Sequence, residues 1–217
     1  MSVLRCCAAV VALTLSAQVS AGPTTTSYVG TLAEAQDVAL IQFSVAVAGA
    51  VNFQTWGFGG GVNGAGTNIA ADGFDPYLSL FSGTGAGATF IASNDDGLCP
   101  PGNTVSGLCR DATLLQSLAA GDYTLVISLT GNMSFAENLG SGTLGDGFIG
   151  LFTPDFYNNE LQALLTGDYA VDITTDAGTT QTVPEPVTLA LAGLGLLATA
   201  IARQRPGRAA AWPAIGA

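Results

Sequence analysis

Apolar and polar residues alternate along much of the chain with a period of two. Residues 37–47 place four apolar side chains on one face of an extended strand: Ile41, Phe43, Val45 and Val47. Such alternation is typical of a β-strand with one buried face. The same pattern predicts strands at 50–56 and 121–129. Shorter alternating runs predict six more strands, at 28–32, 77–82, 89–93, 112–117, 147–152 and 168–174.

Turns rich in Gly, Asn and Asp separate these predicted strands. Regularly spaced strands joined by such turns predict an all-β chain folded as a β-sandwich. One short helix is expected, at residues 158–165, where the sequence is NNELQALL. The Gly-rich segment 57–68 is expected to form a long flexible loop. It is not a phosphate-binding loop, because it has no Lys and no helix is predicted directly after it.

The first segment of the chain, residues 1–21, has the three parts of a secretory signal peptide. Arg5 supplies a positive charge, residues 6–15 are an apolar run, and the tripeptide VSA at 19–21 places small residues before a cleavage point. The sequence therefore predicts export, with signal peptidase as the first partner and a mature domain that begins at Gly22.

An uncharged apolar run of 16 residues, 187–202, lies near the C-terminus. As a helix it would be about 24 Å long, against about 30 Å for the hydrocarbon core of a bilayer. The run is apolar on every side, which favours a short transmembrane helix over an amphipathic core helix. A basic cluster follows it, made of Arg203, Arg205 and Arg208. The positive-inside rule keeps this cluster in the cytoplasm and places the domain on the opposite side of the membrane.

The tripeptide Pro184-Glu185-Pro186, the apolar span and the Arg cluster follow one another in this order, and residues 183–208 resemble a PEP-CTERM sorting tail. In that family an exosortase, a membrane-embedded cysteine protease of Gram-negative bacteria, recognises the tail. The resemblance implies cleavage near the tripeptide and transfer from the inner membrane to the cell surface or the extracellular polysaccharide matrix. Family tails usually stop soon after the basic cluster, whereas this chain continues with an apolar extension at 209–217.

The domain predicted between the two ends, residues 22–182, is strongly acidic. The whole chain carries 16 Asp and Glu against 5 Arg, with no Lys and no His. Fifteen of the acidic residues but only Arg110 of the basic ones fall in the domain, which gives it a net charge of −14. Nucleic-acid binding by phosphate neutralisation is excluded, because it needs a basic face. The absence of His and Lys excludes a Ser-His-Asp triad, a His-ligated zinc site and a Schiff-base lysine.

Cys99 and Cys109 are the only cysteines of this domain. In an oxidising compartment they are expected to form a disulfide around the turn-rich segment between them. A metal site is a poor alternative, because two thiolates would have no His partners.

Three motifs of the domain, DPYLSLF (75–81), SNDDG (93–97) and LAAGDYTLVIS (118–128), resemble the bacterial pre-peptidase C-terminal domains and a related β-sandwich family found ahead of PEP-CTERM tails. The segments DGFIGLF (146–152) and GDYAVDIT (167–174) are similar to the last part of the second family. The resemblance implies a jelly-roll-like β-sandwich with an accessory, non-catalytic role. Within these motifs Gly-Asp-Tyr occurs twice, and we expect each copy to turn the chain into a strand whose Tyr enters the core.

Acidic loops provide the first candidate chemistry. Carboxylate oxygens in flexible loops suit Ca²⁺, which takes about 6–8 oxygen ligands. The predicted calcium ligands are Asp75, Asp95 and Asp96, with Asp72, Asn94 and Asp111 as further candidates. The spacing is not that of an EF-hand, and the alternative is that these residues serve the turns, where Asp and Asn are favoured.

Carbohydrate chemistry is the second candidate. Hydrolysis of a glycoside would need two of Glu34, Glu137 and Glu160, none of which adjoins a Trp-lined groove in the pattern. Sugar binding would use Trp56 with Phe58, or Phe156 with Tyr157, although such aromatic residues more often belong to the core. We therefore expect an exported, non-catalytic surface or matrix protein. The alternative is a calcium- or carbohydrate-binding module of the matrix, and an enzyme is disfavoured.

Overall fold

The computed structural model describes residues 22–99, 101–139, 141–150, 155–176 and 181–182. By its contacts the chain divides into two units, Met1–Gln181 and Thr182–Ala217, and the fold described here is that of the first. Strands dominate the described residues, and their helical structure is limited to α1 (Phe135–Leu139) and the 3-10 turn η1 (Leu144–Asp146). The prediction of an all-β chain is confirmed.

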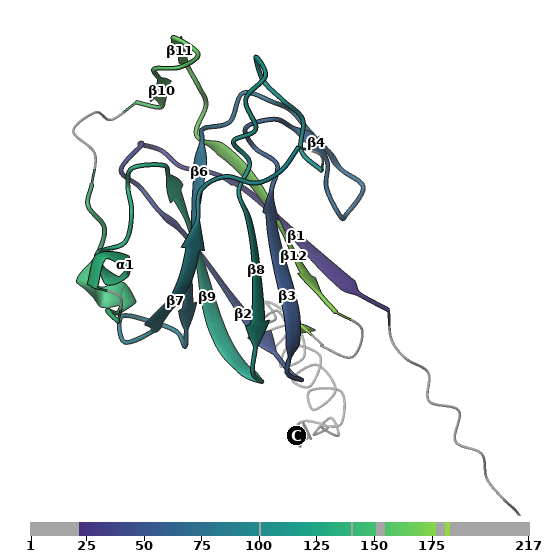
Figure 1. The fold of residues 1–217 in the computed structure, drawn as a ribbon, viewed down its shortest axis with the longest axis vertical. Coiled ribbons are helices and arrows are strands. Elements are labelled where there is room, and N and C mark those ends of the chain that lie inside the picture. The colour runs from purple at the N-terminus through teal and green to yellow at the C-terminus, as the bar shows by residue number, and fades with distance from the viewer. Residues whose placement is uncertain (1–21, 100, 140, 151–154, 177–180, 183–217) are drawn as a thin grey trace, which may run out of the picture. The chain divides into compact units, whose positions relative to one another are not determined.

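The first large sheet has four antiparallel strands in the order β1-β12-β3-β8 (Figure 1). Its strands are β1 (Thr24–Thr31), β12 (Asp168–Thr175), β3 (Gly49–Thr55) and β8 (Thr113–Leu118). Because β1 pairs with β12, the start of the domain lies beside its last long strand. The predicted strands at 28–32, 50–56, 112–117 and 168–174 correspond to these four.

The second large sheet has the order β13-β2-β9-β6-β7. Its strands are β2 (Ala39–Val45), β9 (Gly121–Leu129), β6 (Pro76–Ser82), β7 (Thr89–Asn94) and the short β13 (Gln181–Thr182). The pairs β2–β9, β9–β6 and β6–β7 are antiparallel. The alternation along the chain therefore located every long strand of both sheets.

The core lies between the two sheets and is built from the apolar faces of their strands. Ile41, Phe43 and Val45 of β2 are all buried, as their spacing predicts. The ring of Phe43 meets the ring of Phe53 on β3 edge to face, with centroids 5.6 Å apart. This contact joins the two sheets, which makes the domain a β-sandwich. Val47 was expected on the same face, but it follows the end of β2 and is 53% exposed.

A second apolar cluster covers the outer face of the second sheet. Val126 of β9 and Phe81 of β6 pack there against Ala88 and against Ala136 of α1. The neighbours Leu125 and Ile127 point into the main core. Strand β9 is thus buried on both faces, which one-sided alternation does not predict. Helix α1, which the sequence did not indicate, supplies the cover.

Each Gly-Asp-Tyr motif leads into a strand and ties it to its neighbour. Asp122 lies opposite Ser44 and accepts a 2.6 Å hydrogen bond from its hydroxyl. Asp168 lies opposite Thr31 and accepts an equivalent bond of 2.6 Å. The tyrosines that follow, Tyr123 and Tyr169, pack with the main core. The prediction of a repeated turn into a strand is therefore confirmed.

The helix predicted at residues 158–165 is wrong. Here β10 (Tyr157–Asn158) and β11 (Ala163–Leu164) form a small antiparallel hairpin. The side-chain oxygen of Asn158 accepts hydrogen bonds from the backbone N–H groups of Glu160 and Leu161, both at 2.9 Å. Such local bonding is an alternative to a helix and explains the turn.

The strand predicted at 147–152 is also wrong for the residues that can be described. Gly147 and Gly150 have φ of 83° and 75°, which an extended strand does not accommodate. Phe148 makes only an isolated bridge, to Ser134. Residues 151–154 lie outside the described part of the chain.

The Gly-rich segment 57–68 has more structure than the predicted flexible loop. It contains β4 (Gly61–Val62), which pairs with β5 (Asn68–Ile69) as an antiparallel hairpin. Two buried carboxylates, Asp111 and Asp172, accept hydrogen bonds from its backbone at Gly59 and Gly64.

The predicted signal peptide (1–21), transmembrane helix (187–202), Arg cluster and extension (209–217) lie outside the described residues. Among the residues that the structure describes, no helix has the length and apolar character needed to cross a membrane.

Candidate functional site

The single basic residue of the acidic domain, Arg110, lies among three carboxylates. Its Nη1 is 2.8 Å from Oδ2 of Asp96, and its Nη2 is 2.5 Å from Oε2 of Glu160. Its Nε is 3.8 Å from Oδ2 of Asp75. The partners come from three separate segments, since Asp75 precedes β6, Asp96 follows β7 and Glu160 lies in the turn of the β10–β11 hairpin. We call these four residues the Arg110 cluster.

Asp75 is the most perturbed carboxylate of the Arg110 cluster. Its side chain is only 14% exposed. Burial raises the pKa of Asp75 to about 7, with a further contribution from the negative charge of Asp96. Arg110 and a hydrogen bond from the Thr130 hydroxyl act in the opposite direction, towards a lower pKa. Asp75 is therefore close to the midpoint of its titration at neutral pH.

Two of the three calcium ligands predicted from the sequence, Asp75 and Asp96, pair with Arg110. The guanidinium of Arg110 pairs with both Asp75 and Asp96, so a cation already lies between two of the three expected ligands. Asn94 donates its side-chain N–H groups to the carbonyl oxygens of Asp96 and Thr113. Within the described residues no group of three or more acidic or Cys side chains is arranged to hold a metal ion.

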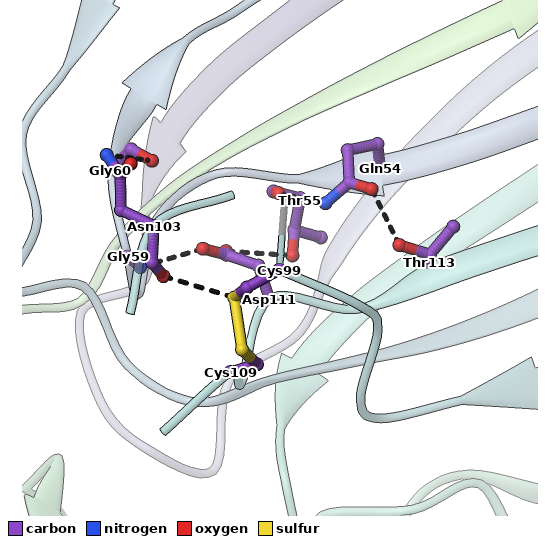
Figure 2. The surroundings of a disulfide bond; sticks show 9 residues. All are labelled: Gln54, Thr55, Gly59, Gly60, Cys99, Asn103, Cys109, Asp111 and Thr113. Carbon is purple, nitrogen blue, oxygen red and sulfur yellow. Dashed lines mark hydrogen bonds between the residues drawn. A yellow bond between two sulfur atoms is a disulfide. The ribbon is translucent and has the colours of Figure 1, made fainter. Parts of the chain in front are cut away.

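The disulfide predicted between Cys99 and Cys109 is present (Figure 2). It closes the turn-rich segment between β7 and β8, and Asp111 follows it by two residues. The pairing was predictable from the number of cysteines in the domain and from the expected export.

Asp111 is a buried carboxylate that joins β3 to the Gly-rich segment. It accepts hydrogen bonds from the hydroxyl of Thr55 at 3.0 Å, from the N–H of Phe58 at 3.2 Å and from the N–H of Gly59 at 2.7 Å. Burial raises the pKa of Asp111, and the three donors oppose that shift. Its role is to fix the chain after β3, and it is not available as a ligand at the surface.

The disulfide loop packs directly on the same segment, as Figure 2 shows for Asn103, Gly59 and Gly60. The side-chain amide of Asn103 donates to the carbonyl oxygen of Gly60 at 3.3 Å. A Cβ atom at Gly59 would collide with the backbone carbonyl of Asn103. Gly59 is therefore required by close approach of two backbones.

A second buried carboxylate, Asp172 of β12, holds the far part of the Gly-rich segment. It accepts hydrogen bonds from the indole N–H of Trp56 at 2.8 Å and from the backbone N–H of Gly64 at 2.7 Å. The hydroxyl of Ser27 on β1 donates to its other oxygen at 2.5 Å. This role of Asp172 could not be predicted from the sequence, because only the register of β12 with β1 and β3 brings its partners together.

Most aromatic residues considered for sugar binding belong to the core. Trp56 and Phe58 are 8% and 1% exposed, and Phe156 stacks on Phe74. Tyr157 is 46% exposed and lies on the hairpin.

The three glutamates considered for glycoside hydrolysis each have a local partner. Glu137 accepts a hydrogen bond from the Tyr77 hydroxyl at 2.5 Å, and Glu160 pairs with Arg110. Glu34 accepts one from the side-chain amide of Gln36 at 2.5 Å.

The sorting residues Pro184, Glu185 and Pro186, like the basic residues Arg203, Arg205 and Arg208, lie outside the described part of the chain. A family model described as the PEP-CTERM protein-sorting motif matches residues 182–205. The resemblance of this tail is therefore confirmed, and the motif implies an exported, membrane-transiting protein processed by exosortase in a Gram-negative-type cell. No curated protein matches the chain.

Proposed function

We propose that the protein is a non-catalytic component of the cell surface or the extracellular polysaccharide matrix. In this proposal signal peptidase removes residues 1–21, and the apolar run 187–202 holds the precursor in the inner membrane with its domain in the periplasm. Exosortase then cuts near Pro184-Glu185-Pro186 and transfers the domain outwards. The observation that carries the proposal is the sorting motif at 182–205, which begins at the last residue of β13.

The physical character of the domain supports a passive role outside the cell. Its charge of −14 keeps copies apart in solution, and its disulfide suits an oxidising compartment. Its buried carboxylates are engaged by backbone N–H groups and hydroxyls. We propose that it has no enzymatic activity and shares the accessory role of the pre-peptidase C-terminal-like, jelly-roll-like domains that it resembles.

The test is fractionation of wild-type and exosortase-deleted cells, with the mass of the protein measured in each fraction. We expect a form that begins at Gly22 and lacks Trp212 at the surface of wild-type cells. In deleted cells the protein should stay in the inner membrane with its tail attached. Glu185→Ala should also hold the precursor in the membrane, whereas Glu34→Ala, a matched change on the domain surface, should leave release unchanged. A surface form that retains residues 187–202 in wild-type cells would contradict the proposal.

A further inference from the structure

The first and last long strands bring both ends of the domain's chain to one end of the sandwich. Thr24, the first residue of β1, lies opposite Thr175, the last residue of β12. Only residues 22–23 separate β1 from the predicted signal peptide, and residues 176–186 separate β12 from the predicted apolar span. We call the end of the sandwich that carries Thr24 and Thr175 the tail end, and the opposite one the far end.

Two short turns close the sandwich at the tail end and run side by side. Residues 46–48 join β2 to β3, and residues 119–120 join β8 to β9. They are neighbours because the strands that they join pair with one another, β2 with β9 and β3 with β8. Val45, the last residue of β2, lies opposite Gly121, the first residue of β9. Both turns pass from one sheet to the other, so they cover the core at this end (Figure 1).

A third turn, residues 83–88, joins β6 to β7 at the same end. The N–H of Gly83 donates a 2.7 Å hydrogen bond to the carbonyl oxygen of Asp122, the second residue of β9. This turn therefore lies beside the other two.

The three turns carry no charged residue, since their sequences are AVA, AA and GTGAGA. Val47 is 53% exposed, and the alanines at 46, 48, 86, 119 and 120 are exposed as well. Surface turns are usually rich in Asn, Asp and Ser. Here they form a smooth, largely apolar surface, which we call the uncharged end.

The acidic residues concentrate at the far end of the sandwich. Nine of the fifteen in the domain lie in the connections β1–β2, β5–β6 and β7–β8 or between β10 and the start of β12. They are Glu34, Asp37, Asp72, Asp75, Asp95, Asp96, Asp111, Glu160 and Asp168. Three lie near the tail end, and two of these are engaged, Asp122 by the hydroxyl of Ser44 and Asp146 by the N–H of Thr143. The third, Asp176, follows β12.

The length of the strands separates the two ends electrostatically. Strands β2 and β9 have seven and nine residues, which at about 3.3 Å per residue places the ends about 23–30 Å apart. This separation is more than two Debye lengths at physiological ionic strength, where one Debye length is about 8 Å. The nine carboxylates therefore act weakly on a surface that meets the uncharged end, but would repel an anionic surface that met the far end.

The predicted tether is long enough for either end to reach a membrane. Residues 176–186 span at most about 40 Å when fully extended. The chain length alone thus does not choose an orientation, although the attachment at the tail end favours that end. The charge distribution makes the choice, because it opposes contact of the far end with anionic lipids.

We propose that the uncharged end lies against the lipid headgroups of the inner membrane while the precursor is anchored, with the acidic far end turned towards the periplasm. The inference deepens the proposed function and rests on it for the anchor. Such a contact keeps the chain that leads to the sorting motif close to the membrane surface, where exosortase acts.

The test uses the full precursor, purified from exosortase-deleted cells and inserted into vesicles of phosphatidylethanolamine and phosphatidylglycerol with a quencher on some headgroups. A fluorophore is attached to one added cysteine, from Ala119→Cys at the uncharged end or Asn159→Cys in the turn of the β10–β11 hairpin. Cys99 and Cys109 are bonded to one another, so the added thiol is the one labelled once residues 1–21 are removed.

Charge variants show whether the uncharged end itself makes the contact. Val47→Glu with Ala86→Glu adds two carboxylates to that end. The matched control, Leu98→Glu with Leu164→Glu, adds two carboxylates at exposed positions of the far end, where these leucines are 83% and 66% exposed. A melting curve confirms that each variant is folded.

We expect the label at position 119 to be quenched several-fold more than the label at position 159. Each carboxylate added to the uncharged end should lower the population in contact with the anionic vesicle about fivefold. The quenching at 119 should then approach that at 159, whereas the far-end control should leave it unchanged. Equal quenching at the two positions, stronger quenching at 159, or equal effects of the two charge pairs would overturn the inference.

Flotation of the same vesicles separates this inference from the proposed function. A precursor that floats with the vesicles and is quenched equally at both positions rejects the orientation alone. A precursor that does not float has no membrane anchor, which rejects the proposed function and the orientation together.

Discussion

The backbone N–H of Gly59 donates a 2.7 Å hydrogen bond to the carboxylate of Asp111, which is 4% exposed. This bond joins a residue two positions before β8 to the segment that follows β3. It also sets the distance between the Gly-rich segment and the disulfide loop. The buried charge is tolerated because three donors converge on it.

Replacing Asp111 by Asn should lower stability by about 2 kcal/mol. The amide of Asn keeps one acceptor but turns an N–H₂ group towards the donors of Phe58 or Gly59, and a buried donor without a partner costs about 1–3 kcal/mol. The melting temperature should fall by about 4–8 °C. Asp176→Asn removes the same charge from an exposed position and should change it little. Equal effects of the two variants would mean that net charge, and not the buried contact, sets the stability.

Asp75 should make the domain less stable as pH rises from about 4 to about 7. Its pKa is about 7 in the folded protein and about 4 in the unfolded chain, so the folded state binds more protons in this interval. The contribution of Asp75 to stability is complete below the pKa of the unfolded chain and is lost as pH rises through the pKa of the folded protein. The free energy of unfolding should fall by at most about 1.4 kcal/mol per pH unit in this interval. Urea unfolding from pH 4.5 to 8 measures it.

Asp75→Asn supplies the comparison for this pH dependence. The amide resembles the protonated acid in shape and can still accept the hydrogen bond from Thr130. The variant should therefore gain stability relative to the native protein as pH rises. Parallel pH profiles for the two proteins would contradict the assignment of this titration to Asp75.

The Arg110 cluster should depend much more on Arg110 than on Glu160. Arg110→Gln leaves Asp75 and Asp96 without their cation, and Asp75 is mostly buried, so the loss should be several times larger than for Glu160→Gln. Glu160 is 53% exposed, and exposed ion pairs contribute about 0–1 kcal/mol. Urea unfolding of both variants at pH 8 and low salt makes the comparison. Equal losses would show that Arg110 acts mainly by holding the hairpin.

The alternation of residues predicted the sandwich because burial on one face leaves a period of two in the chain. Phe43 and Phe53 are both at such positions, and their rings meet between the sheets. The errors fall where a local contact overrides the pattern. The side-chain oxygen of Asn158 accepts hydrogen bonds from the backbone N–H groups of Glu160 and Leu161, and a hairpin forms there in place of the expected helix. Val47 lies beyond the end of its strand, so the alternation no longer decides which way its side chain points.

The Arg110 cluster and the buried carboxylates are formed by contacts between segments that are far apart in the sequence. The alternation of residues along a single strand carries no information about such contacts. The composition shows that Arg110 is the only basic residue of the domain, but it does not show that Arg110 lies between Asp75 and Asp96. Likewise, Trp56 and Asp172 are 116 residues apart in the sequence, and they meet only because β12 pairs with β3. The cysteines were predictable because only one pairing exists within the domain.

Gly59→Ala should destabilise the domain through a clash with the disulfide loop. The φ of Gly59 is not in the positive region that disfavours Ala, so the penalty is steric: the new Cβ meets the backbone carbonyl of Asn103, which the disulfide between Cys99 and Cys109 holds in place. Overpacking of this kind costs about 1–3 kcal/mol. Gly87→Ala is the matched control, because a Cβ there has no neighbour within 4 Å and should have a small effect.

The same clash should weaken when the disulfide is removed. With Cys99→Ala and Cys109→Ala the loop that carries Asn103 can retreat, so Gly59→Ala should cost about 1 kcal/mol less in that background than in the native one. Removing the disulfide alone should cost about 3 kcal/mol, because the unfolded chain is no longer closed into a loop. Urea unfolding of the native protein, the Gly59 variant, the cysteine variant and their combination gives the coupling energy. Strict additivity would mean that the loop is held against Gly59 by Asp111 and Asn103 alone, independently of the covalent bond.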